Sequence, residues 1–474
     1  MDVAKISVLC SLSFLLVAVA GGHQAPIAHT PSQPWQPGVI IPEIVASAHP
    51  EQSYALYLPS KYSPEKKWPI VYAFDPAARG SMPVVLMKDA AERFGYIVVG
   101  SNNSRNGSWK IEAQAAQAMF QDTGNRLAID NQRVYFAGFS GGARVASQLA
   151  QRCKCAAGVL LNGAGFSAGS APSTAVVFPV FAAVGNFDFN YGELIELDAK
   201  LAALKFSHWL RRFEGPHEWA PQSAMAEAFA WFRLMAMKNG SEPRDESFIS
   251  AQSAERARTL EESGDLYLAW FEYRQTAETF DKLTDITPLQ ERATALENEK
   301  AVREGAKREK QELEEQRQLE SPISAGMAAL GGNDPNRTDT RHQLEQEILG
   351  LRGRAEHEKH ADKLRIEKRA LAGVLVAAME EGGQRLDAND PSRAQDYFEL
   401  ASDADPDSVW ALSNLAVARA LTGNRKGVLD ALRRAKQKTK DAPAFLQWLQ
   451  AEPAFTKFRS APEFAALLDL HVPQ

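Results

Sequence analysis

The chain has 474 residues, a length that predicts two or three domains rather than one. Apolar residues form 45% of the sequence and charged residues 24%, which are ordinary values for a globular protein with a sizeable core. The formal net charge of −6 gives no electrostatic case for a protein that binds nucleic acid.

Residues 1–20 have the features of a secretory signal peptide. Lys5 precedes the mostly apolar run 6–20, and the sequence Ala-Val-Ala at 18–20 fits an A-x-A cleavage site. We therefore predict an exported protein, secreted or periplasmic; an uncleaved N-terminal anchor is the alternative. No later apolar run is long enough to cross a bilayer, so no membrane span is expected after removal of the signal. Residues 21–37, rich in Pro, Ala, Gln and His, predict an exposed lead-in.

Strand and helix patterns alternate over residues 38–239. The run 68–74 is almost continuously apolar, as expected for a strand in the buried middle of a parallel sheet. The alternation predicts an α/β fold with a mostly parallel central sheet. Strands are expected at 39–44, 53–57, 68–74, 96–100, 133–137, 156–163, 176–185 and 208–214, and helices at 84–94, 111–127, 143–151, 193–204 and 223–238.

A serine motif lies where the strand 133–137 passes into a helix. Gly138-Phe139-Ser140-Gly141-Gly142 reads G-x-S-x-G, with a strand before it and a helix after it, which is the context of a nucleophile elbow. Glycines on both sides allow the strand and the helix to approach closely while the serine hydroxyl stays exposed. The motif predicts Ser140 as a nucleophile.

These features resemble the α/β-hydrolase family, most closely its esterase and polyhydroxyalkanoate-depolymerase-like branch. The resemblance covers residues 38–239. It implies the α/β-hydrolase fold, with the elbow after the fifth strand, and a serine hydrolase. No metal and no organic cofactor are expected, because the mechanism needs neither.

A serine hydroxyl needs a histidine to take its proton, and the histidine needs an acid to hold its tautomer. The family has these residues in the chain order Ser, Asp or Glu, His. Asp188 follows the strand 176–185 directly, and His217 lies in the loop before the last helix. The resemblance therefore assigns the catalytic triad to Ser140, Asp188 and His217. A turn cap is the alternative for Asp188, and His208 competes with His217 but begins a strand.

The oxyanion hole is expected from backbone N–H groups after the nucleophile and after the third strand. Gly141 is the first donor. Some families of this fold have a His-Gly signature where this chain has Asp75-Pro76. Pro76 has no N–H, so Ala77 is the candidate for the second donor. Asp75 either orients a polar or cationic substrate group or caps a helix.

The loop 101–109 follows a strand at the sheet edge where ligands bind in α/β folds. Its side chains, Asn102 and Asn103 among them, are candidates to bind hydroxyls or ester oxygens. Aromatic residues are candidates for an apolar acyl or ring subsite, with ordinary core or rim packing as the alternative. These residues are Trp109, Phe139, Phe187 and Trp219.

The mature chain would keep two cysteines, Cys153 and Cys155. A C-x-C pair can form a disulfide or bind a metal with other ligands. No further cysteine or His cluster supports either arrangement. We therefore favour two free thiols at the end of a helix, and the disulfide is the alternative.

The sequence changes character after a polar linker at 240–250. Residues 251–372 are dominated by Glu, Lys, Arg and Gln, which predicts charged, coiled-coil-like helices. Gly, Pro, Asn and Ser near 321–340 predict a flexible loop within them.

Residues 373–474 resemble the tetratricopeptide repeat. Small residues such as Ala418 and Ala431 recur where paired helices would touch, and Pro406 follows the helical run 393–401. The resemblance implies stacked helix pairs with a concave surface for a protein partner. A plain helical domain and an intramolecular brace for the hydrolase are the alternatives.

Together these patterns predict an exported serine hydrolase that cleaves a small-molecule or polymeric carboxylic ester through an acyl-enzyme. The alternatives are a peptidase of the same fold and a non-catalytic scaffold of the tetratricopeptide type.

Overall fold

The structure is a computed structural model that describes residues 35–167, 170–261, 264–332 and 336–468. The predicted signal peptide at 1–20 and nearly all of the predicted lead-in at 21–37 lie outside these residues. Within the described ranges, every helix is too short or too polar to cross a membrane.

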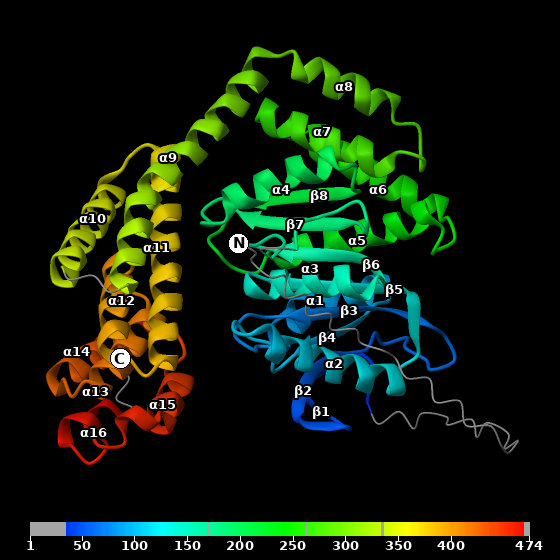
Figure 1. Cartoon of the computed structure of the whole chain (residues 1–474). Coiled ribbons are helices and arrows are strands. Elements are labelled where there is room, and N and C mark those ends of the chain that lie inside the picture. The colour runs from blue at the N-terminus through cyan, green and yellow to red at the C-terminus, as the bar shows by residue number, and fades with distance from the viewer. Residues whose placement is uncertain (1–34, 168–169, 262–263, 333–335, 469–474) are drawn as a thin grey trace, which may run out of the picture.

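The first half of the chain forms one eight-stranded sheet with helices on both faces (Figure 1). The strand order is β1-β2-β4-β3-β5-β6-β7-β8. β2 runs antiparallel to β1 and β4, and all other neighbours are parallel. This confirms the predicted α/β fold with a mostly parallel sheet. The strands are β1 (Ile40–Ala46), β2 (His49–Tyr57), β3 (Trp68–Phe74), β4 (Ile97–Ser101), β5 (Ile129–Phe139), β6 (Ala156–Asn162), β7 (Val180–Gly185) and β8 (His208–Phe213).

Helices cover the sheet in two layers. Side chains of α2, α3 and α4 enter the core on one face, and those of α1 and α5 enter the core on the other. Helices α1 to α4 lie on the connections between parallel strands, as in βαβ units, and α5 follows the last strand. The helices are α1 (Ser81–Phe94), α2 (Trp109–Arg126), α3 (Gly141–Cys153), α4 (Tyr191–Ala203) and α5 (Gln222–Asn239).

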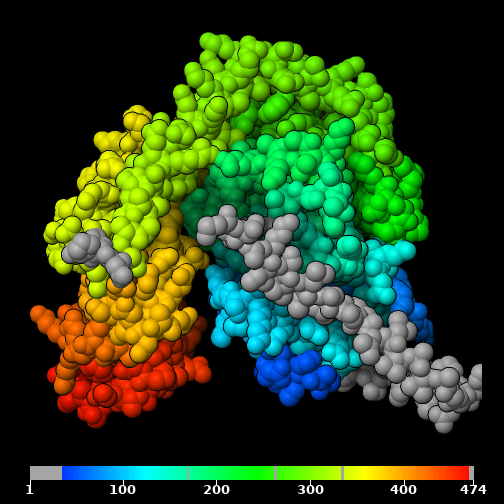
Figure 2. Space-filling view, in the orientation of Figure 1, coloured from blue at the N-terminus to red at the C-terminus, as the bar shows by residue number. Residues whose placement is uncertain are grey.

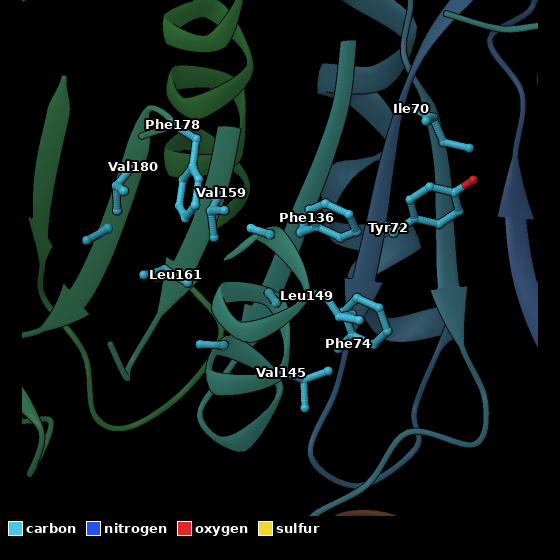
Figure 3. Packing of buried hydrophobic residues seen from close by; sticks show 14 of the residues in the cluster. Ile70, Tyr72, Phe74, Phe136, Val145, Leu149, Val159, Leu161, Phe178 and Val180 are labelled. Atoms are coloured by element: carbon cyan, nitrogen blue, oxygen red, sulfur yellow. The ribbon is translucent and has the colours of Figure 1, made fainter. Parts of the chain in front are cut away.

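β3 shows why its sequence is apolar at every position. All of its residues are buried, and successive side chains point to opposite faces of the sheet. Ile70, Tyr72 and Phe74 pack into the core beneath α3, while Val71 and Ala73 pack into the core beneath α1. Figure 3 shows the first of these cores at the centre of the sheet, where α3 lies over β3, β5 and β6.

The second half of the chain is entirely helical in the part that the structure describes. Residues 246–280 contribute side chains to the two cores of the sheet, and residues 300–468 form a lobe beside the sheet (Figures 1 and 2). The first helix of this half begins at Glu246, inside the predicted linker 240–250. The helices are α6 (Glu246–Glu261), α7 (Leu266–Phe280), α8 (Thr287–Glu297), α9 (Lys300–Gly331), α10 (Arg337–His357), α11 (Ala361–Asp387), α12 (Pro391–Ala404), α13 (Val409–Leu421), α14 (Arg425–Lys438), α15 (Ala442–Ala451) and α16 (Pro462–Leu468), with a short 3₁₀ turn at Pro453–Phe455.

The prediction of a flexible loop near 321–340 is wrong for residues 321–331, which continue α9 with Pro322 inside the helix. A proline within a helix costs about 3 kcal/mol. Ile323, Met327 and Leu330 recur at helical spacing and are buried in the core of the lobe with residues of α10 and α11. Tertiary packing therefore overrides the local propensity. The likeness of residues 373–474 to tetratricopeptide repeats stays a prediction.

The elbow depends on two close backbone approaches. A Cβ atom on Gly142 would lie 2.0 Å from the carbonyl oxygen of Phe74, and one on Gly138 would lie 2.0 Å from the carbonyl oxygen of Gly142. A backbone carbonyl cannot move aside to make room for a Cβ atom, whereas the end of a long side chain can. These glycines therefore permit α3 to sit directly against β3 and β5.

We expect Gly142→Ala to lower the free energy of unfolding by about 1–3 kcal/mol, because the added methyl group overpacks a backbone contact. Gly124→Ala is the matched control in α2, where an added Cβ meets no atom within 4 Å. This control should gain up to about 1 kcal/mol through helix propensity alone. Urea unfolding followed by circular dichroism measures both, and a Gly142 variant as stable as the control would contradict the contact.

Candidate active site

Ser140 occupies the apex of the turn between β5 and α3. Its backbone has φ 53° and ψ −122°, a conformation that costs a non-glycine residue free energy and persists only when its surroundings enforce it. The Ser140 N–H donates to the carbonyl of Asn162 at 2.8 Å, and its own carbonyl accepts from Ala143 N–H at 2.9 Å. The turn is thus fixed from β6 and from the helix.

The structure brings Ser140, His217 and Asp188 into one hydrogen-bonded chain. His217 Nε2 lies 2.9 Å from Ser140 Oγ, and His217 Nδ1 lies 2.9 Å from Asp188 Oδ1. Asp188 is fully buried and the imidazole is 14% exposed. The geometry suits a neutral imidazole whose Nδ1–H donates to the carboxylate while Nε2 accepts from the serine hydroxyl.

The sheet explains why these three residues meet. Ser140 follows β5, Asp188 follows β7 and His217 follows β8, so all three lie where parallel strands end at one edge. The imidazole contacts the rings of Phe139 and Phe189, whose centroids are 4.6 and 4.3 Å from its own. The predicted Phe139 therefore contacts the histidine directly, and Phe189 is a site residue that sequence reasoning missed.

His208, the competing histidine, lies within β8 and is buried. Its Nε2 is 3.2 Å from Asp198 Oδ1. Burial alone would lower the pKa of His208, but the hydrogen bond and charge of Asp198 outweigh it and raise the pKa. His208 therefore contacts buried Asp198 and is not part of the hydrogen-bonded chain with Ser140.

Asp75 is fully buried, and its carboxylate forms hydrogen bonds with protein groups. Its carboxylate accepts from the Ala77 N–H, from Arg79 and from the Trp219 indole, each at 2.9 Å. Burial opposes ionisation, but these hydrogen bonds outweigh it and hold the pKa of Asp75 below its ordinary value. Asp75 thus anchors a turn and Trp219. The helix-cap alternative is wrong, because the N-cap of α1 is Gly80 and no side chain caps that helix.

The predicted oxyanion donors differ in availability. Gly141 is the first residue of α3, so its N–H has no acceptor within the helix. The Ala77 N–H is already bound to Asp75, which leaves no second donor there. Asn106 lies next to Gly141 instead: a Cβ on Gly141 would come within 1.8 Å of its side-chain oxygen. Sequence reasoning singled out the loop 101–109, but nothing in it distinguished Asn106 from its neighbours.

Other predicted binding residues serve different purposes. Asn102 and Asn103 bond the β1–β2 segment, through the carbonyl of Pro42 and the N–H of Ser53 respectively. Trp109 begins α2 and packs on the sheet core beneath Arg152, whose guanidinium is 4.9 Å from its ring. The structure brings none of these three into the hydrogen-bonded chain.

Phe187 belongs to the turn that carries Asp188, and it lines a cavity of about 520 Å³ together with Pro216 and residues of α11. Its ring lies under Lys368 of that helix, at 5.4 Å. This predicted subsite residue therefore faces the helical lobe.

Cys153 and Cys155 are joined in a disulfide, so the favoured prediction of two thiols is wrong. Lys154 between them adopts a left-handed conformation with φ 54°, which reverses the chain at the end of α3 and brings the two Cα atoms to 5.1 Å. Within the residues that the structure describes, no group of three or more His, Cys, Asp or Glu side chains is arranged to hold a metal ion.

No protein-family model and no curated protein matches the chain. Among solved structures, a ferulic acid esterase is similar over 42% of this chain and 97% of its own, at 17% identity and a TM-score of 0.37. An S-formylglutathione hydrolase from Staphylococcus aureus is similar over 38% of this chain and 90% of its own, at 12% identity and a TM-score of 0.32. A feruloyl esterase module from Clostridium thermocellum is similar over 41% and 86%, at 16% identity and a TM-score of 0.32.

These likenesses do not assign an activity to this chain. The strand order and strand directions of the sheet, with helices on both faces, are those of the α/β-hydrolase fold. An all-helical region follows it.

Replacing Asp75 with Asn keeps the shape of the side chain and removes its charge. We expect a loss of about 1–3 kcal/mol in the free energy of unfolding at pH 7. The folded-state pKa of Asp75 is lowered. The stability that its ionised carboxylate contributes is therefore fully present above the unfolded-state pKa and is lost as the pH falls through the folded-state pKa. The difference between wild type and Asp75→Asn should therefore shrink below about pH 4. Urea unfolding at pH 7 and pH 3.5 tests this, and an unchanged difference would contradict it.

Proposed function

We propose that this protein is a serine hydrolase that cleaves carboxylic esters through an acyl-enzyme. The observation that carries the proposal is the hydrogen-bonded chain from Ser140 through His217 to buried Asp188, on a serine held in a strained backbone conformation. A structural serine needs neither the strain nor a histidine aligned by a buried acid. The proposal includes export, which rests on the sequence of residues 1–20.

The geometry supports a two-step reaction. Ser140 Oγ attacks the acyl carbon while His217 Nε2 takes the hydroxyl proton, and Asp188 stabilises the imidazolium that forms. The tetrahedral intermediate collapses, the C–O bond to the alcohol breaks, and His217 gives its proton to the leaving alkoxide. Water then attacks the acyl-enzyme by the same route, releasing the acid and restoring the Ser140 hydroxyl.

The oxyanion needs donors placed before the reaction begins. The Gly141 N–H supplies one. We assign the second to the side-chain Nδ2 of Asn106, because the Ala77 N–H is bound to Asp75 while Asn106 Nδ2 would lie 3.4 Å from a Cβ on Gly141.

We expect Ser140→Ala and His217→Ala each to lower kcat by about a thousandfold or more on p-nitrophenyl esters of short and medium acyl chains. The double variant should be scarcely worse than either single variant, because the two residues act as one unit. Labelling of Ser140 with a fluorophosphonate probe gives an independent readout. A wild-type protein that neither turns over these esters nor reacts with the probe would overturn the proposal, and cleavage of peptide substrates alone would favour the peptidase.

Removal of the Asn106 amide should lower kcat with little change in KM, because an oxyanion donor acts chiefly in the transition state. We expect a loss of about 10²–10³-fold in kcat for Asn106→Ala. Ser108→Ala is the control from the same loop, since that side chain makes no capping hydrogen bond to α2. Equal losses for both variants, or full activity of Asn106→Ala, would contradict the assignment.

A further inference from the structure

Two helices of the lobe, α9 and α11, lie against the turn that carries Asp188. We call residues 186–191 the acid turn. Its residues contact side chains that come more than a hundred positions later in the sequence, with separations of 127 and 183 residues for two of the hydrogen bonds. The acid of the hydrogen-bonded chain is therefore held partly by the helical half of the protein.

Arg369 of α11 makes the most extensive of these contacts. Its side chain is only 1% exposed, and its Nε donates to the carbonyl of Asn186 at 2.6 Å. The guanidinium carbon lies 3.8 Å from the ring centroid of Tyr191, and Nη1 lies 3.8 Å from Glu312 Oε2. Burial of a guanidinium is costly unless its partners are fixed. Arg369 thus joins the first and last residues of the acid turn.

Gln316 of α9 holds the middle of the same turn. It is buried, and its Nε2 donates to the carbonyl of Phe189 at 3.0 Å. The Phe189 ring contacts the His217 ring, with centroids 4.3 Å apart. At Gly373, α11 approaches so closely that an added Cβ would lie 3.5 Å from Phe189 Cβ. Asp188 is thus flanked on both sides by residues that the helical lobe fixes.

The end of the acid turn has a further attachment to α9. The Tyr191 hydroxyl donates to Glu309 at 2.7 Å, and Arg212 of β8 pairs with the same carboxylate at 2.8 Å. Glu309 therefore connects α9 both to the acid turn and to the strand that leads to His217.

We propose that Arg369 is a positioning residue of the active site, and that with Gln316 it makes the helical lobe a part of the hydrolase's active site. The inference rests on the proposed hydrolase function. Arg369 and Gln316 hold the backbone on either side of Asp188, so that the carboxylate meets His217 Nδ1 at the distance at which it fixes the tautomer and stabilises the imidazolium. A displacement of about 1 Å in such a group can cost on the order of 10²-fold in rate.

The test measures kcat and KM of the full chain on the best p-nitrophenyl ester, well below the measured unfolding temperature of each variant. We expect Arg369→Ala to lower kcat about 10–100-fold with KM nearly unchanged, and Arg369→Lys to recover part of the loss. Lys363→Ala is the control from the same helix, because Lys363 is an exposed cation of α11. It should stay within about threefold of wild type, as expected for a charge on the surface.

A double-mutant cycle separates positioning from simple bracing. If Arg369 acts through Asp188, the Arg369→Ala substitution should lower kcat less than about threefold in the Asp188→Asn variant. The same substitution should lower kcat far more in the wild-type protein. Gln316→Ala offers the same cycle should Arg369→Ala fail to fold, with an expected loss of about tenfold.

The outcomes keep the two proposals apart. A wild-type protein without esterase activity or probe labelling would remove the proposed function itself. An active wild type with an Arg369→Ala variant of equal kcat, or with the same loss in the Asp188→Asn background, would overturn only the positioning role.

Discussion

The close approach of three backbones at the elbow is the constraint on which the rest of the site depends. Gly138 and Gly142 leave room for β5, α3 and the end of β3 to touch, and any Cβ there would meet a carbonyl oxygen at 2.0 Å. That contact forces Ser140 into its unusual backbone conformation and turns its hydroxyl toward the edge where the parallel strands end. Asp188 and His217 then need only follow β7 and β8 to reach it, because neighbouring parallel strands end side by side.

This dependence explains why so much of the site was predictable. A serine at a strand-to-helix turn, an acid after one later strand and a histidine after the next are all local features of the sequence. The parallel sheet converts this order along the chain into proximity, so Ser140, Asp188 and His217 meet as predicted. The same holds for the sheet, since a continuously apolar run such as β3 reports burial on both faces.

What the sequence did not reveal depends on partners far away along the chain. The Ala77 N–H is unavailable because Asp75 binds it, and Asp75 is itself held by Trp219, 144 residues later. Asn106 is distinguished from its neighbours only by its position against Gly141. Residues 321–331 contain turn-forming residues yet remain helical, because Ile323 and Met327 find an apolar core supplied by other helices. In each case the decisive contact is tertiary, and no local pattern encodes it.

The helical lobe and the sheet each supply partners to the other's buried polar groups. Arg369 is buried against Tyr191 and Asn186, so in the absence of the acid turn its charge would lack a backbone acceptor and an aromatic face. Conversely, the acid turn without α9 and α11 would lose acceptor and donor partners at Asn186, Phe189 and Tyr191. Each part therefore supplies what the other needs to bury its polar groups, which couples their folding. The backbone around Asp188 therefore has hydrogen-bond partners in both halves of the chain, so the geometry of Asp188 depends on both.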